Sequence, residues 1–172
     1  MPAFVTEYPQ FFTATNLQWK KLLQPDKYKD IVIESLRFLI AKERIRLFGF
    51  VIMPNHLHLI WQMQPLIAPS HVQRDFLKYT AQQIKFDLLQ HHPDVLKHFL
   101  VDASDRNYQF WERRPLSIEL RTHEVFLQKL EYIHWNPVKA NLCQFPEEYK
   151  YSSAGFYHNG KDDWEFLTHY RD

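Results

Sequence analysis

The sequence predicts an α+β fold in which an antiparallel sheet carries helices packed mainly on one face. The order of the predicted elements is the first reason: strand, helix, strand, strand, helix, strand and helix, followed by a loop-rich tail from about residue 143. The second reason is the turn signal at residues 53–55 (MPN), which joins two strand-like segments into a hairpin. Because no repeat or break in composition divides the chain, a single domain is expected over residues 1–172.

Three strands and one helix are predicted in the first half of the chain. Residues 11–15 (FFTAT) are aromatic and β-branched, which is typical of a strand. Pro25 then begins a long helical pattern, because proline is favoured where a helix starts. Residues 46–53 and 56–62 are largely apolar and are predicted to form the two strands of the hairpin.

The second half is predicted to add two helices and one strand. Residues 91–114 are polar and irregular, and residues 116–120 form the fourth strand. Thr122 can cap the last helix, and Pro137 is expected to end it, because proline cannot donate a backbone hydrogen bond. The earlier of the two helices covers about residues 72–89, with a predicted buried stripe of Leu77, Ala81, Ile84 and Leu88.

Composition and charge exclude several classes of protein. With 172 residues, 45% of them apolar, the chain is long enough to bury a core. The 3 glycines form no glycine-rich phosphate loop, and the single Cys143 excludes an internal disulfide framework or a cysteine-based zinc finger. No segment resembles a signal peptide or a membrane span, so a cytoplasmic protein is expected. Because the net charge is only +1, any phosphate-binding surface must come from local clusters of lysine and arginine.

The segment His56-Leu57-His58 is the first candidate for chemistry. Side chains alternate along a strand, so His56 and His58 point to the same face while Leu57 points to the other. Two imidazoles at this spacing can bind one divalent metal. Taken alone, the pattern more often indicates two polar residues on the solvated face of a hairpin.

The predicted last helix carries the second candidate. Tyr132 and Asn136 are four residues apart and therefore share one helix face, away from the apolar stripe of the helix. The Asn136 side-chain oxygen could complete a metal site that the Tyr132 phenol also reaches. The alternative is an amphipathic tyrosine at a layer edge with an asparagine near the end of the helix.

Two groups of basic residues are candidates for contacts with nucleic acid. The first group lies on one face of the helix at 72–89, and the second surrounds the aromatic segment 108–111 (YQFW). The alternatives are a solvated charged face for the helix and core packing for the aromatic segment. The candidates are Arg74, Lys78 and Lys85 in the first group, and Arg106, Arg113 and Arg114 in the second.

Other residues offer weaker candidates. Tyr79 could compete with Tyr132 as a nucleophile, but only Gln83 accompanies it at a spacing of four residues. His91, His92 and His98 could suggest a second metal site, although an irregular segment around Pro93 favours surface positions for them.

Three sequence blocks resemble those of one transposase superfamily. Residues 50–60 (FVIMPNHLHLI) look like the histidine–hydrophobe–histidine hairpin of the single-tyrosine HUH transposases. Residues 132–142 (YIHWNPVKANL) resemble the tyrosine helix of the REP-associated tyrosine transposases within that superfamily. Residues 151–154 (YSSA) resemble the tail signature that follows this helix. The blocks occur in the family's order, and the resemblance covers roughly residues 8–158.

The resemblance implies both a fold and an activity. The fold is a ferredoxin-like sheet with His56 and His58 on a central strand. Tyr132 is then the nucleophile, Asn136 the third metal ligand, and the metal Mg²⁺ or Mn²⁺, although imidazole also suits zinc. The activity is that of a single-strand DNA endonuclease and transposase that cleaves and rejoins DNA through a 5′-phosphotyrosine link. Hairpin DNA as the substrate and a homodimer as the working unit are also implied by the resemblance.

Two other functions stay open on the sequence. A non-catalytic module derived from a transposase would bind hairpin nucleic acid without cleaving it. A metal hydrolase that uses water as its nucleophile would cleave DNA and leave no protein–DNA adduct. The presence of His56, His58, Tyr132 and Asn136 together favours the transposase, because a binding module needs no such set.

Overall fold

A four-stranded antiparallel sheet forms the centre of the protein in the computed structural model, which describes residues 8–172. Its strand order is β2-β3-β1-β6, the order of a ferredoxin-like sheet. The predicted fold class is confirmed, and each predicted strand is present within two residues of its expected bounds. Residues 1–7, part of the predicted domain at 1–172, lie outside the described residues. The four strands are β1 (Gln10–Thr15), β2 (Ile45–Ile52), β3 (His56–Met63) and β6 (Leu116–Glu119).

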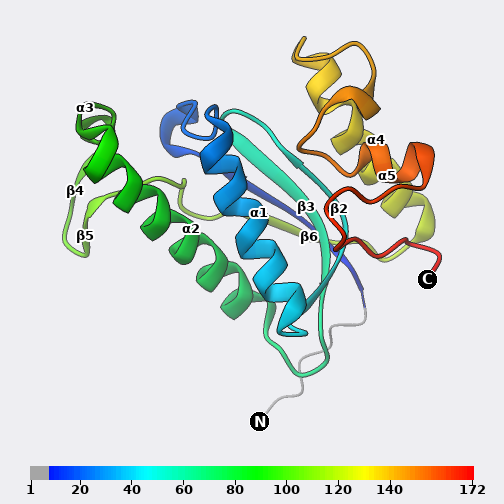
Figure 1. Cartoon of the computed structure of the whole chain (residues 1–172). Helices are drawn as coiled ribbons and strands as arrows, with labels where there is room; N and C mark the ends of the chain where they lie inside the picture. Colours follow the sequence, from blue (N-terminus) through cyan, green and yellow to red (C-terminus); the bar gives the residue numbers. More distant parts are fainter. Residues whose placement is uncertain (1–7) are drawn as a thin grey trace.

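Helices cover both faces of this sheet. The helices α1 (Asp26–Ala41) and α2 (Pro69–His91) pack side by side on one face and form the larger hydrophobic core with it. The helices α4 (His123–Lys139) and α5 (Ala154–Asn159) lie on the other side of the strands (Figure 1). A second, smaller core joins α4 to that side of the sheet, so the helix that carries Tyr132 lies apart from the main helical layer.

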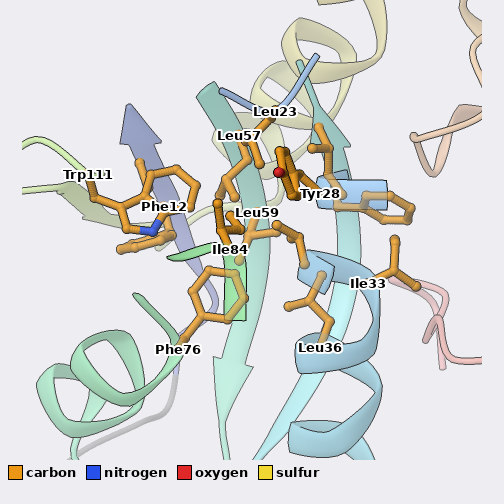
Figure 2. Packing of buried hydrophobic residues seen from close by; sticks show 14 of the residues in the cluster. Phe12, Leu23, Tyr28, Ile33, Leu36, Leu57, Leu59, Phe76, Ile84 and Trp111 are labelled. Atoms are coloured by element: carbon orange, nitrogen blue, oxygen red, sulfur yellow. The ribbon is translucent and has the colours of Figure 1, made fainter. Parts of the chain in front are cut away.

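The buried stripe of α2 differs from the predicted one. Ile84 and Leu88 are buried as expected, but Leu77 and Ala81 lie at the edge of the core. The reason is Thr80, which is fully buried because its hydroxyl donates to the Phe76 carbonyl at 3.0 Å and accepts from Trp111 Nε1 at 3.2 Å. Figure 2 shows the packing of Phe76 and Ile84 against side chains of the sheet. The observed stripe is Val72, Phe76, Thr80, Ile84 and Leu88.

The expectation that residues 91–114 are irregular was partly wrong. The segment contains a short helix, α3 (Pro93–Leu96), and a two-stranded hairpin formed by β4 (Leu100–Ala103) and β5 (Arg106–Tyr108). Three 3₁₀ turns complete the secondary structure of residues 8–172. They are η1 (Leu17–Trp19), η2 (Lys97–Phe99) and η3 (Pro146–Glu148).

The start of α4 was predicted correctly and its end was not. The Thr122 hydroxyl accepts a hydrogen bond from the Val125 N–H at 3.2 Å, which confirms the cap. Pro137 lies inside the helix, because the residues after it still donate backward: Ala140 N–H to the Asn136 carbonyl at 3.1 Å. The helix therefore reaches Lys139, one turn beyond the metal-ligand candidate Asn136.

Two contacts set the position of α4 on the sheet. Gly49 lets the helix approach β2 closely, since a Cβ atom at this position would lie 2.7 Å from Leu130 Cδ1. The tail residue Ser153 lies beneath the helix and is fully buried. Its hydroxyl accepts from the Phe50 N–H at 3.0 Å and contacts His134 Nε2 at 2.8 Å. The tail signature therefore acts as a structural link between β2 and α4.

Within residues 8–172, no helix is long and apolar enough to cross a membrane.

Candidate active site

The two histidines of β3 face the helix α4. Because side chains alternate along the strand, Leu57 and Leu59 enter the core beneath α1 and α2, whereas His56 and His58 emerge on the opposite face. The two imidazole rings lie 4.9 Å apart, measured between centroids. The Tyr132 ring lies 5.5 Å from the His58 ring. The side chains predicted from His-x-His and from the tyrosine helix thus meet at one place.

His58 is a buried, neutral imidazole with one unused nitrogen. Its side chain is 5% exposed, and its ring stacks on Phe11 at 5.2 Å. Burial, the neighbouring His56 and Lys129 together lower the pKa of His58 to about 3. Nδ1 lies 2.7 Å from Thr13 Oγ1, while Nε2 is buried and has no hydrogen-bond partner in the described part of the chain. An orphaned buried nitrogen of this kind calls for an explanation, and a metal ion supplies one.

His56 has a carbonyl oxygen at each of its ring nitrogens. Nδ1 lies 2.7 Å from Asn55 Oδ1, and Nε2 lies 3.0 Å from Asn136 Oδ1. Burial lowers the pKa of His56, although the Asn136 contact opposes the shift, so the ring is neutral near pH 7. A neutral imidazole carries only one N–H and cannot donate to both oxygens. When Nδ1–H donates to Asn55, the lone pair of Nε2 faces the Asn136 oxygen, which is an arrangement that a cation between them would stabilise.

The donor atoms of this site fit a divalent metal. Across residues 8–172, no three histidine, cysteine, aspartate or glutamate side chains come together as a metal site. A third ligand beside His56 and His58 must therefore be of another type, and the Asn136 amide oxygen is already in contact with His56. The imidazole nitrogens suit Zn²⁺, and the amide oxygen, with water in the remaining positions, suits Mg²⁺ and Mn²⁺.

Tyr132 lies at the open side of this cluster. Its side chain is 44% exposed, and its ring meets Phe11 edge to face at 6.2 Å. The ammonium groups of Lys129 and Lys139 lie 5.7 and 5.9 Å from the centroid of the phenol ring. The exposed phenol is accessible to a substrate, and the two ammonium groups beside it attract a substrate that carries negative charge.

Several residues of this site were not predicted from the sequence. Lys129 and Lys139 carried a usable signal, because with Tyr132 and Asn136 they follow the spacing of one helix face. Thr13 and Asn55, which contact the two histidines, carried none, since strand pairing and a turn bring them there. Trp19, whose ring lies 5.9 Å from that of His56, was also missed.

The predicted DNA-binding residues lie elsewhere. Those on α2 belong to the helical layer on the face of the sheet opposite α4, so they do not adjoin Tyr132. Several basic side chains already have partners in the chain. Arg74 pairs with Asp75 at 3.3 Å, Arg106 and Arg113 pair with Asp105 at 2.7 and 3.5 Å, Lys85 lies over the Tyr108 ring at 5.3 Å, and Lys78 and Arg114 are exposed.

The weaker candidates are not part of the site. Tyr79 is 47% exposed on α2, on the other side of the sheet from both histidines. His91 lies 4.0 Å from Asp87, and His92 lies 2.8 Å from the Lys27 ammonium. A cation next to His92 disfavours metal binding there, in agreement with the surface positions expected for these residues.

Acid is expected to destabilise the metal-free protein partly through His134, whose ring packs beside Tyr157 and Ser153. Burial lowers the pKa of His134 from 6.5 to about 4. Since the unfolded chain takes up a proton between these values and the folded chain does not, the free energy of unfolding falls as the pH drops from about 6.5 to about 4. His134→Gln should reduce that fall by up to about 3 kcal/mol in urea titrations with EDTA. The exposed control His71→Gln should not, and an unaltered pH dependence in His134→Gln would contradict the expectation.

Comparison with known proteins identifies the family. The chain belongs to the IS200-like transposases, a class of DNA-processing protein, because the model of that family matches residues 14–134. The family membership predicted from the three sequence blocks is thereby confirmed. No curated protein matches the chain.

Two solved structures share the fold. One is a REP-associated tyrosine transposase bound to a REP hairpin, with 17% sequence identity and a TM-score of 0.67 over 98% of this chain and 90% of that one. The other is a predicted transposase from Deinococcus radiodurans R1, with 14% identity and a TM-score of 0.50 over 76% of this chain and 91% of that one. The antiparallel sheet of this chain and the helices around it thus form a fold that is shared with solved transposase structures.

Proposed function

We propose that this transposase is a single-strand DNA endonuclease that cleaves and rejoins DNA through a 5′-phosphotyrosine link to Tyr132. One observation carries the proposal. The buried, unpartnered Nε2 of His58 and the His56–Asn136 contact form a metal-ligand set directly beside an exposed phenol. Neither a binding module nor a water-using hydrolase requires a tyrosine at this position.

His56, His58 and Asn136 would hold the divalent ion, Mg²⁺ or Mn²⁺. When bound, such an ion supplies charge neutralisation at the scissile phosphate and orients the leaving oxygen. Each histidine is held at the ring nitrogen that does not face the metal. Thr13 contacts Nδ1 of His58, and Asn55 contacts Nδ1 of His56. Both contacts leave Nε2 as the nitrogen available for coordination.

Tyr132 performs the covalent step. Its phenol oxygen attacks the phosphorus, the bond to the 3′ oxygen breaks, and the phenol proton is lost while the 3′ oxygen gains one. The products are a 5′-phosphotyrosine and a free 3′-hydroxyl. Because one phosphodiester replaces another, a second 3′-hydroxyl can reverse the step and join new ends without ATP.

Lys129 and Lys139 assist this step through their positive charges, which lie close to the phenol. Both ammonium groups lie beside the phenol ring, so they favour the phosphate in the site and the negative charge that develops on the phenol oxygen. Since these two lysines are on the tyrosine's own helix, they keep their place relative to the nucleophile.

Hairpin DNA is the proposed substrate and a homodimer the proposed working unit. The similarity to a transposase solved with a REP hairpin supports the first part. The predicted basic residues on α2 and around β5 remain candidates for contacts with DNA outside the active site, where double-stranded stem phosphates would lie. These candidates are Arg74, Lys78, Lys85, Arg106, Arg113 and Arg114.

The proposed function is tested by trapping the covalent product. The protein is incubated with an excess of Mn²⁺ or Mg²⁺ and a labelled hairpin oligonucleotide with single-stranded flanks taken from beside its gene. A slow, protease-sensitive band on a denaturing gel is expected with metal and is expected to disappear with EDTA. Binding without an adduct would favour the non-catalytic module, and cleavage without an adduct would favour the water-using hydrolase.

A further inference from the structure

Trp19 is an exposed indole at the edge of the candidate active site. Its side chain is 61% exposed, which is unusual for so large an aromatic ring. The ring meets that of His56 edge to face, with 5.9 Å between centroids. Most of the Trp19 side chain is therefore exposed next to the proposed metal ligands, and no role in the core accounts for it.

The backbone that presents Trp19 is strained and firmly held. Gln18 and Trp19 both have positive φ angles, 53° and 59°, a region that residues with side chains rarely adopt. Such a conformation persists only where the surroundings fix it. Here the Gln18 N–H donates to the Glu112 carboxylate at 2.6 Å, and the Trp19 N–H donates to the Asn16 carbonyl at 2.9 Å.

The same segment is connected to a proposed metal ligand. Asn55 Nδ2 donates to the Trp19 carbonyl at 3.4 Å, while Asn55 Oδ1 contacts His56 Nδ1 at 2.7 Å. One side chain thus contacts both the imidazole and the backbone that carries the indole. The backbone of Trp19 is therefore held close to a proposed metal ligand.

We propose that Trp19 is a stacking platform for an unpaired base next to the scissile phosphate. This inference rests on the proposed function and extends it by assigning a subsite for single-stranded DNA. Base stacking on an aromatic ring is tolerant of sequence, because every base has a π-face. Lys21, which is exposed two residues after Trp19, can contact the phosphates beside that base. The Lys20 ammonium instead donates to the His98 carbonyl and lies over the Phe99 ring.

The test separates base stacking from phosphate binding. Affinities are measured by fluorescence anisotropy, in EDTA so that no chemistry occurs, for a labelled dT12 oligonucleotide and for a fully abasic 12-mer with the same phosphates. Trp19→Ala should weaken dT12 binding roughly 5- to 150-fold and leave binding of the abasic strand unchanged. Trp19→Phe should restore most of the affinity. Phe38→Ala, a similarly exposed aromatic (57%) on α1, is the matched control and should change neither affinity.

Several outcomes would overturn the proposal. These are no binding of dT12 by the wild type, equal loss for both strands in Trp19→Ala, no loss for either, or a change in oligomeric mass without a change in affinity. The last result would make Trp19 a protein–protein contact. Failure of the proposed function is seen separately: a protein that binds dT12 through Trp19 and forms no covalent adduct with metal keeps the stacking site and loses the tyrosine mechanism. A protein that forms the adduct equally well after Trp19→Ala keeps the tyrosine mechanism and loses the stacking site.

Discussion

Replacement of Tyr132 by phenylalanine should abolish the covalent protein–DNA adduct and lower the rate of strand cleavage by at least about 10⁴-fold, because removal of a nucleophile leaves only binding and orientation. The ring contacts with Phe11, His58 and Lys129 do not involve the hydroxyl and should persist. Hairpin affinity, measured by anisotropy in EDTA, should therefore change by no more than about threefold, because Tyr132 is 44% exposed and its hydroxyl forms no hydrogen bond within residues 8–172 that would be lost. The measurement is a denaturing gel of labelled DNA over time in Mn²⁺.

Tyr79→Phe is the matched control for this prediction. Tyr79 has nearly the same exposure, 47%, but lies on α2 across the sheet, so its variant should form adduct at the wild-type rate. Loss of adduct in Tyr79→Phe with retention in Tyr132→Phe would move the nucleophile to α2. Continued cleavage without adduct in Tyr132→Phe would identify water as the nucleophile.

His58→Phe should uncouple stability from metal binding. In EDTA, the variant should be as stable as the wild type or more stable, because phenylalanine keeps the stacking on Phe11 and removes a buried nitrogen that has no partner. Addition of Mn²⁺ at about 100 times its Kd should raise the free energy of unfolding of the wild type by about 2.7 kcal/mol and leave that of the variant unchanged. The rate of adduct formation should fall by about 10³-fold or more, since the metal contributes several kcal/mol to such reactions.

Urea titrations with and without Mn²⁺ provide the measurement, and His134→Gln provides the control. His134 is on α4 near the site, but it contacts Ser153 and not the proposed ligands, so its variant should keep the Mn²⁺ response. A metal response that survives in His58→Phe would remove this histidine from the ligand set. A large loss of stability of His58→Phe in EDTA would mean that its Thr13 contact dominates over the unpaired Nε2.

Local patterns were sufficient for most of the fold. Strand composition, the turn at residues 53–55 and the Thr122 cap are encoded within a few residues, and all were found. The predicted stripe of α2 was wrong because burial of Thr80 depends on Trp111, which lies 31 residues away and supplies the hydrogen bond that makes burial favourable. The end of α4 was missed because proline in a helix costs one hydrogen bond, and packing of the buried Pro137 offsets that loss.

The candidate site was also predicted in part from local patterns and in part not. Strand alternation placed His56 and His58 on one face, and helical spacing placed Tyr132 with Asn136, without any knowledge of the fold. The meeting of these two faces depends on the order of strands in the sheet and on the packing of α4 against it. This meeting was predicted from the family resemblance. The support for the histidines from Thr13 and Asn55 comes from pairing between distant segments and from a turn, and neither leaves a periodic signal.

The close approach at Gly49 has a consequence for protein engineering. The proposed nucleophile and the proposed third ligand are on one helix, so any outward movement of α4 would displace Tyr132 and Asn136 together from the histidines of β3. A methyl group at position 49 would press on Leu130 and Ile133, the residues by which this helix rests on β2. Gly49 therefore limits how far the proposed nucleophile and ligand can shift relative to the histidines, and variant libraries that aim to alter activity should leave this glycine unchanged.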